Sequence, residues 1–276
     1  MNATTITAPA PVDLDEVRDH IRDMYRDVAN EAGRDLHFPT GRALAEALGY
    51  PAELLDRLPV RAVTSFAGVG YHLGLARLLP GEHVLDLGSG SGMDVFAAAA
   101  QVAPDGFVTG VDITPEQLAK SESLRRDGRV SFRRARIEEL PFEDCSFDAV
   151  ISNGVINLSA DKRRVFTEAE RVLRPGGRLA LADIVTDRQI AAGTACQADL
   201  WAACIAGAGR RDLYLGDVAA AGLELQVVQD NPGYRFSSER AQRTSHKYGA
   251  HSVSLLAVRP VHGSGRQPTT TQEVSK

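Results

Sequence analysis

Hydrophobic residues follow two different repeat patterns along the chain, and the pattern changes near residue 80. Before that point apolar residues such as Leu14 and Val17 recur every three or four positions, which is the spacing of one face of an amphipathic helix. Two further helices are expected at 40–49 and 51–58, because their ends carry the Thr, Pro and Gly residues typical of helix starts and stops. We therefore expect residues 1–79 to form a mainly helical N-terminal lid.

After residue 80, short apolar runs alternate with helical stretches. The expected strands are 83–87, 107–111, 130–135, 147–152, 178–184, 223–229 and 252–258, and the expected crossover helices are 92–102, 115–124 and 161–173. Alternation of strand and helix is typical of a parallel sheet covered on both faces. The pattern predicts an α/β, Rossmann-like, doubly wound and mostly parallel sheet of seven strands over residues 80–262, in which the order of the last two strands stays open.

The composition fits a folded globular protein and narrows the choice of partners. Hydrophobic residues make up 43% of the 276 residues and charged residues 24%. The formal net charge of −5 offers no overall positive field for a phosphate backbone, so we expect no nucleic-acid partner. The Gly-, Ser-, Thr- and Gln-rich tail over residues 263–276 has no core-forming pattern and is expected to be disordered.

Cysteine usage and the absence of long apolar runs favour a cytoplasmic protein. Three cysteines, Cys145, Cys196 and Cys204, are too few and too irregularly spaced for a disulfide framework or a structural metal site. The first eleven residues lack the pattern of a secretory signal, and no apolar run is long enough to cross a bilayer. We expect a cytoplasmic location and no membrane contact.

The strongest chemical motif is a glycine-rich turn after the first strand of the sheet. Residues 84–92 read Val-Leu-Asp-Leu-Gly-Ser-Gly-Ser-Gly, so an apolar strand with Asp86 near its end runs into three glycines. Glycines let the backbone turn tightly and let a ligand lie against it. A dinucleotide site prefers glycine at the first, third and sixth positions of such a turn, but the sixth position here is Met93. The spacing therefore argues against a pyrophosphate site.

An acidic residue follows at the end of the next strand. Asp112 lies about twenty residues beyond the glycines, where a carboxylate is placed to accept hydrogen bonds from both ribose hydroxyls. Taken alone, the glycine turn serves equally well to reverse the chain and Asp112 to cap a helix. A nucleoside ligand accounts for both features together.

These motifs resemble those of the class I S-adenosylmethionine-dependent methyltransferases, and the resemblance covers residues 80–183. It implies that S-adenosyl-L-methionine is the cofactor. Members of the family often carry an acidic residue just upstream of the adenine site, but residues 135–136 of this chain are Ala-Arg. The resemblance also implies that Ile137 and Glu138 flank the adenine and that the end of the fourth strand lies beneath the methionine part of the cofactor. The implied cofactor-binding residues are Asp86, Gly88, Ser89, Gly90, Gly92, Asp112, Ile113, Ile137, Glu138 and Asn153.

Within that superfamily the chain is similar to arsenite methyltransferases at 68–70, 152–158 and 203–208. The resemblance implies a cysteine in each segment to bind As(III), but Val69 and Gly154 occupy two of these positions and only Cys204 is in place. We therefore predict no metal or metalloid site, and we interpret Cys204 as a small buried hydrophobe. Glycine at position 154 favours an organic acceptor larger than arsenite.

Few residues are candidates for a catalytic base. Tyr71 and His72 have the best claim, since they follow the segment that lines the acceptor side in the relatives. The other candidates are His37, His246 and Tyr248. A basic cluster of Arg210, Arg211, Arg243 and Lys247 is interpreted as a solvated surface in preference to a site for an anionic acceptor.

The sequence thus predicts a methyltransferase that transfers a methyl group to a small organic molecule by in-line displacement, as a monomer or homodimer. Arsenite methylation that uses Cys204 is one alternative. A catalytically inactive, cofactor-binding interaction module is another.

Overall fold

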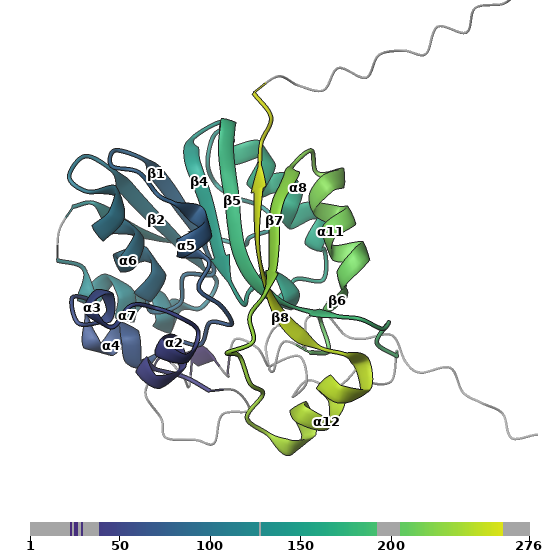
Figure 1. The fold of residues 1–276 in the computed structure, drawn as a ribbon. Coiled ribbons are helices and arrows are strands. Elements are labelled where there is room, and N and C mark those ends of the chain that lie inside the picture. Colours follow the sequence, from purple (N-terminus) through teal and green to yellow (C-terminus); the bar gives the residue numbers. More distant parts are fainter. Residues whose placement is uncertain are drawn as a thin grey trace, which may run out of the picture.

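The computed structural model describes residues 23, 25, 26, 29, 39–126, 128–191 and 205–261. Its centre is a sheet with helices on both faces (Figure 1). The expected disordered tail, most of the first expected helix, and Cys196 and Cys204 lie outside the described residues.

The sheet contains every expected strand and one additional short strand. The strands are β1 His83–Leu87, β2 Phe107–Asp112, β3 Val130–Arg134, β4 Phe147–Asn153, β5 Leu173–Thr186, β6 Gly209–Arg210, β7 Glu224–Asp230 and β8 His251–Val258. Their order is β3-β2-β1-β4-β5-β8-β7, with β6 paired to β5. The first five strands run parallel, whereas β8 is antiparallel to both β5 and β7. The predicted fold class is confirmed, with eight strands in place of seven.

Burial explains the order of the last two strands, which the sequence pattern left open. Most residues of β8 are buried, whereas most residues of β7 are partly or fully exposed. The apolar run of β8 therefore occupies the inner position next to β5, and the Glu- and Gln-containing β7 forms the edge. The chain joins them through a helix, α12, rather than through a tight turn.

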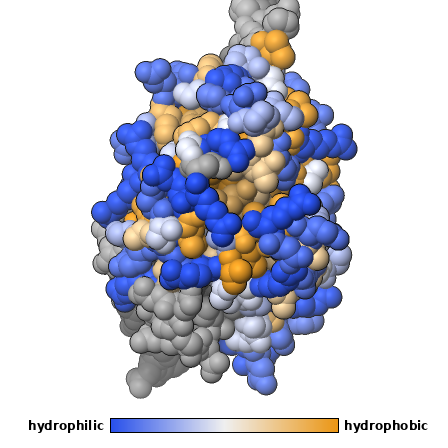
Figure 2. Space-filling model, turned by 90° about the vertical axis from the view of Figure 1, so that its left-hand side faces the viewer, coloured by the Kyte–Doolittle hydropathy of each residue, from blue (hydrophilic) through white to orange (hydrophobic). Residues whose placement is uncertain are grey.

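Helices cover both faces of this sheet. They are α2 Arg42–Ala47, α3 Ala52–Leu55, α4 Val60–Thr64, α5 Leu73–Ala76, α6 Met93–Val102, α7 Pro115–Leu124, η1 Ile156–Leu158, α8 Lys162–Val172, α11 Arg211–Ala220 and α12 Glu239–Tyr248. Thr40 does not cap α2, because the helix follows Gly41, whose φ is 85°. The side of the molecule that carries α3, α4 and α6 is largely hydrophilic, with hydrophobic residues near its middle (Figure 2).

Successive side chains of β1 point to opposite faces of the sheet, so they belong to two separate hydrophobic cores. Leu85 and Leu87 belong to the core that includes residues of α8 and α11, whereas Val84 belongs to the core that includes residues of α5 and α6. Successive side chains of a strand point to opposite faces, so Asp86 shares the face of Val84. A carboxylate is thereby buried on the α6 side, at the end of the strand.

Candidate functional site

A pocket of about 810 Å³ opens at the carboxyl ends of β1, β2 and β4. Ligands of open parallel sheets bind at this edge, where the strand order reverses. Nine of the residues expected to bind a cofactor line the pocket: Asp86, Gly88, Ser89, Gly90, Asp112, Ile113, Ile137, Glu138 and Asn153. The turn after β1 and the ends of β2 and β4 bring these distant parts of the sequence together.

The glycines of the turn have distinct structural roles. Gly88 has a φ of 71°, and a Cβ at this position would overlap the side chain of Val155. Gly90 has a φ of 51°, and its Cβ would meet only Oε1 of Gln117, at 3.9 Å, so this part of the turn is open. Gly92 is not part of the lining, because its missing Cβ faces the ring of Phe132 at 2.9 Å.

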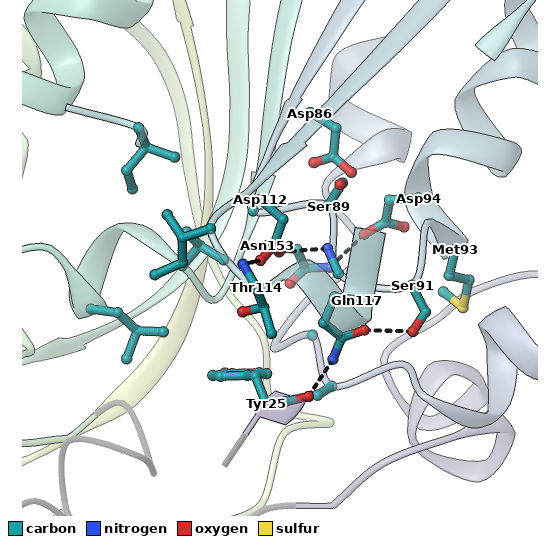
Figure 3. A pocket seen from close by; sticks show the side chains of 18 of the residues that line it. Tyr25, Asp86, Ser89, Ser91, Met93, Asp94, Asp112, Thr114, Gln117 and Asn153 are labelled. Carbon is teal, nitrogen blue, oxygen red and sulfur yellow. Dashed lines mark hydrogen bonds between the residues drawn. The ribbon is translucent and has the colours of Figure 1, made fainter. Parts of the chain in front are cut away.

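Asp112 organises the loop that follows β2. Its Oδ2 accepts a hydrogen bond from the backbone N–H of Gly90 at 2.9 Å, and its Oδ1 accepts one from the N–H of Thr114 at 2.8 Å (Figure 3). Burial raises the pKa of Asp112, and these hydrogen bonds partly offset the rise. Each carboxylate oxygen keeps a lone pair for a ligand.

Asp86 is a buried carboxylate without a partner. Its side chain makes no hydrogen bond or ion pair within the described part of the chain, although the residue is only 2% exposed. Burial, and then the negative charges of Asp94 and Asp112, raise its pKa well above the usual value. A group in this state gains stability from any cation that enters the pocket.

A third carboxylate, Asp94, was not expected from the sequence. It lies in the first turn of α6, where Tyr50 donates a hydrogen bond to its Oδ1 at 2.5 Å and Asn153 donates one to its Oδ2 at 3.1 Å. An acidic residue at the start of a helix is common for structural reasons alone, so the sequence held no signal of this contact. The hydroxyl of Ser89, also in the lining, is buried and has no hydrogen-bonding partner among the described residues.

Asn153 connects this network to the opposite wall of the pocket. Its Oδ1 accepts hydrogen bonds from the N–H groups of Val69 at 2.8 Å and Gly70 at 3.3 Å, and its Nδ2 donates to the carbonyl of Gly70 at 3.0 Å. Ser252 holds the carbonyl of Val69 from the other side, at 2.6 Å. The end of β4 thus fixes the segment that resembles the arsenite methyltransferases. A Cβ on Gly154 would lie 3.4 Å from Val69, so the two non-cysteine positions adjoin.

Tyr71 and His72, the expected catalytic residues, do not line the pocket. The ring of Tyr71 packs against Tyr50 with centroids 4.6 Å apart. His72 is fully buried, neither ring nitrogen has a hydrogen-bonding partner among the described residues, and burial lowers its pKa. Their catalytic role stays a prediction.

One end of the pocket is formed where β3 leads into the 135–138 segment, which was expected to flank an adenine. Ile137 is buried there, and Glu138 accepts a hydrogen bond from Ser159 at 2.6 Å. Ile113, on the loop after β2, is 36% exposed. These apolar side chains can flank a planar base.

Helix α7 holds described residues of the N-terminal region at the pocket. Gln117 accepts a hydrogen bond from Ser91 at 2.6 Å and donates one to the carbonyl of Tyr25 at 2.8 Å. Lys120, three residues after Gln117 on the same helix, donates to the carbonyl of Ala29 at 3.0 Å. Tyr25 is part of the lining, and the role of the N-terminal region as a lid stays a prediction.

A second pocket, of about 700 Å³, lies between the ends of β5 and β7, the start of β8 and α12. Its charged groups largely interact with one another: Arg211 is 3.2 Å from Asp230, and His251 is 3.9 Å from Asp187 and 3.8 Å from Asp230. Two further arginines of the expected basic cluster also form ion pairs, Arg210 with Asp212 and Arg243 with Glu239.

Within the described residues, no group of three His, Cys, Asp or Glu side chains has the arrangement of a metal site. The same residues include no helix with the length and apolar character needed to span a membrane.

Comparison with known proteins gives consistent matches. Residues 78–240 match the family described as a methyltransferase domain. An arsenite methyltransferase of Halobacterium salinarum is 37% identical over 84% of this chain and 64% of its own length, and one of Aquipseudomonas alcaligenes is 39% identical over 67% and 58%. The chain spans less than two thirds of the length of these two relatives.

A solved structure agrees with these matches. The arsenic (III) S-adenosylmethionine methyltransferase from Chlamydomonas reinhardtii superposes with a TM-score of 0.62 at 30% identity, over 82% of this chain and 76% of that protein. The similarity therefore extends well beyond the glycine turn.

Proposed function

This chain belongs to the methyltransferase domain family, in the subgroup that resembles arsenite methyltransferases, and we propose that the whole protein transfers a methyl group from S-adenosylmethionine to a small organic molecule. The family expected from the sequence is confirmed, and at the level of the family so are the enzyme class and its cofactor. The acceptor and the detailed roles of residues are parts of the proposal.

One observation carries the proposal: three carboxylates, the buried Asp86 and Asp94 and the partly buried Asp112, face one pocket beside an open glycine turn (Figure 3). Buried carboxylates repel one another and are costly unless a cation or hydrogen-bond donors compensate them. A ligand with ribose hydroxyls and a cationic amino-acid part supplies both. S-adenosylmethionine has this composition, so the residues present fit the cofactor.

Different lining residues would bind different parts of the cofactor. Asp112 would accept hydrogen bonds from the ribose, the open turn at Gly90 would let the backbone approach the ligand, and the unpartnered Asp86 would bind the amino group. Ile113 and Ile137 would flank the adenine. When bound, S-adenosylmethionine supplies a methyl group made electrophilic by its positively charged sulfur.

The acceptor side of the pocket is largely apolar. Phe66, Met93, Val155 and Leu158 line it, and such a wall excludes water and orients an organic molecule. Alignment of the acceptor with the methyl group can account for much of the rate of an in-line displacement. The expected acid–base role of Tyr71 and His72 has no direct support here, since both lie outside the lining.

Arsenite methylation is the second candidate, because both similar relatives carry that name. Against it, the adjoining positions 69 and 154 are valine and glycine, so they bring no sulfur to the site. As(III)-dependent turnover that a Cys204→Ser change abolishes would support this candidate, whereas an enzyme for organic acceptors is indifferent to the change.

A cofactor-binding module without catalysis is the third candidate. It would retain affinity for S-adenosylmethionine and transfer no label. We further propose that the protein acts in the cytoplasm as a monomer or homodimer, without nucleic acid or membrane, which its net charge of −5 supports.

The deciding experiment uses S-adenosylmethionine labelled in its methyl group. The protein is incubated with it and with fractionated metabolites, and labelled products are identified by mass spectrometry. Label in an organic product supports the proposal, label only in arsenic species supports the second candidate, and binding without transfer to any fraction supports the third.

A further inference from the structure

Asp94 differs from the other carboxylates of the pocket in how its oxygens are satisfied. Oδ1 accepts a hydrogen bond from the Tyr50 hydroxyl at 2.5 Å, and Oδ2 accepts one from the Asn153 amide at 3.1 Å. Both donors are neutral. Asp94 therefore has its hydrogen bonds but lacks a compensating charge.

No side chain in the described part of the chain supplies that charge. Asp94 forms no ion pair there, and Arg134 and Arg136 are the only lysine or arginine side chains among the described lining residues. Those arginines lie at the β3 side: Arg134 stands opposite Asp112 in the β2–β3 register, and Arg136 lies 3.7 Å from Glu138. The N-terminus of α6 favours an ionised Asp94 but provides only a partial positive charge.

Asp86 presents the opposite requirement. It is buried without any hydrogen-bond donor among the described residues, so it needs a group that brings both donors and charge. An ammonium group is such a partner, because it carries three N–H donors. Asp94 already has one donor on each oxygen, so a positive charge that brings no donor is enough to compensate it.

The cofactor offers one group of each kind. Its amino group is a charged donor, whereas its sulfur, bonded to three carbons, is positively charged and has no hydrogen to donate. Asn153, at the end of β4, donates to Asp94, and this strand end lies beneath the methionine part in the family that the chain resembles. Complementarity therefore assigns Asp86 to the amino group and Asp94 to the sulfur.

We propose that Asp94, held by Tyr50 and Asn153, is a specificity-determining residue that recognises the positive charge on the cofactor sulfur. This proposal rests on the proposed function and deepens it. Once the methyl group leaves, the sulfur becomes a neutral thioether and the attraction is lost. The site then distinguishes S-adenosylmethionine from its product S-adenosylhomocysteine and favours product release.

Isothermal titration calorimetry with purified protein tests the proposal without any acceptor. The probes are S-adenosylmethionine, S-adenosylhomocysteine and sinefungin, which carries an amine in place of the charged sulfur and its methyl group. Wild-type protein should bind sinefungin and S-adenosylmethionine more tightly than S-adenosylhomocysteine. This comparison needs no variant, so it holds even if a substitution prevents folding. Equal or tighter binding of S-adenosylhomocysteine would overturn the proposal.

Three variants locate the effect. Asp94→Asn keeps the shape of the side chain and should weaken S-adenosylmethionine binding by about tenfold more than S-adenosylhomocysteine binding. Asp112→Asn removes an equal charge but faces the ribose, present in both ligands, so it should weaken both by a similar factor. Tyr50→Phe disturbs the same network as Asp94→Asn but keeps its charge, so the preference for the charged ligand should persist.

The outcomes distinguish a failure of the role proposed for Asp94 from a failure of the proposed function. If both ligands bind and Asp94→Asn changes both affinities equally, the role of Asp94 is wrong while the proposed function stands. If Tyr50→Phe removes the preference as fully as Asp94→Asn does, network geometry rather than charge is responsible, and the proposal again fails. If none of the three probes binds the folded wild-type protein, the proposed function itself fails.

Discussion

Two pockets lie at the same edge of the sheet, and they differ in how their charges are compensated. In the pocket next to β1, β2 and β4, the described residues give Asp86 no partner and give Asp94 only neutral ones. In the pocket next to β5, β7 and β8, Asp230 is paired with Arg211 at 3.2 Å, and His251 lies between two carboxylates. Their volumes are similar, at about 810 and 700 Å³, so size does not distinguish them.

The contrast supports our proposal that the first pocket, rather than the second, is the ligand site. In the second pocket, Asp230 has an arginine partner within the protein. In the first, the described residues supply no opposite charge to the buried Asp86 and Asp94, so a cationic ligand that binds there would gain binding energy. Four predictions test this contrast, from the largest expected effect to the smallest.

The largest effect is expected at the glycine turn of the first pocket. Gly88→Ala forces a side chain into a φ of 71° and against Val155, so the free energy of unfolding should fall by about 4 kcal/mol. Gly81→Ala is the matched control, because its φ is 87° but nothing lies within 4 Å of the added Cβ; it should cost about 1 kcal/mol. Urea unfolding measures both, and equal losses would mean that the turn is not tightly constrained.

The second effect concerns Asp183, a buried carboxylate whose hydrogen bonds all come from neighbouring groups of the described protein. Asn157 N–H, Ile184 N–H and the Tyr214 hydroxyl donate to it at 3.0, 2.9 and 2.9 Å, yet burial raises its pKa to about 6. Because the folded protein holds this proton more tightly than the unfolded chain, the stabilisation is present below about pH 4 and is lost as the pH rises through 6.

The measurement compares wild-type protein with Asp183→Asn by urea unfolding between pH 4 and pH 7. The stability of the wild type relative to the variant should fall by about 3 kcal/mol over this range. A constant difference would show that Asp183 titrates normally in the fold.

The third effect sharpens the contrast between the pockets directly. Asp112→Ala should reduce the affinity for S-adenosylmethionine by about 100-fold, since it removes the partly buried acceptor that we propose binds the ribose. Asp230→Ala removes a carboxylate from the second pocket and should leave the affinity within about twofold. Calorimetric titration gives both values, and a similar loss in the two variants would remove the distinction between the pockets.

The smallest effect is expected from the exposed ion pair of the second pocket. Arg211→Ala should change the free energy of unfolding by less than about 0.5 kcal/mol, because the Asp230 side chain is 62% exposed and water screens the pair. Thermal unfolding at low and high salt provides the test. A loss above about 2 kcal/mol would show that this pocket depends on its charges more than we infer.

The sequence predicted the parts of this molecule that depend on local patterns. Alternating apolar runs located the strands, and the spacing from the glycine turn to Asp112 located one side of the pocket. The inner position of β8 was not predictable from periodicity, because it depends on competition between two strands for burial.

The hydrogen-bond network around Asp94 could not be predicted from the sequence either. Tyr50, between α2 and α3, and Asp94, in α6, are 44 residues apart, and only the tertiary fold brings them together. Tyr71 illustrates the converse: Gly68, three residues before it, lines the pocket, but the ring of Tyr71 packs against Tyr50 and does not line the cavity. A motif locates a backbone segment, whereas the direction of a side chain depends on its neighbours in space.

The most direct test of the central claim is a crystal structure of the protein grown with S-adenosylhomocysteine. We predict that the ligand occupies the first pocket, with its ribose hydroxyls bonded to Asp112 and its amino group at Asp86. A ligand seated in the second pocket, or a first pocket without it at saturating concentration, would contradict the account.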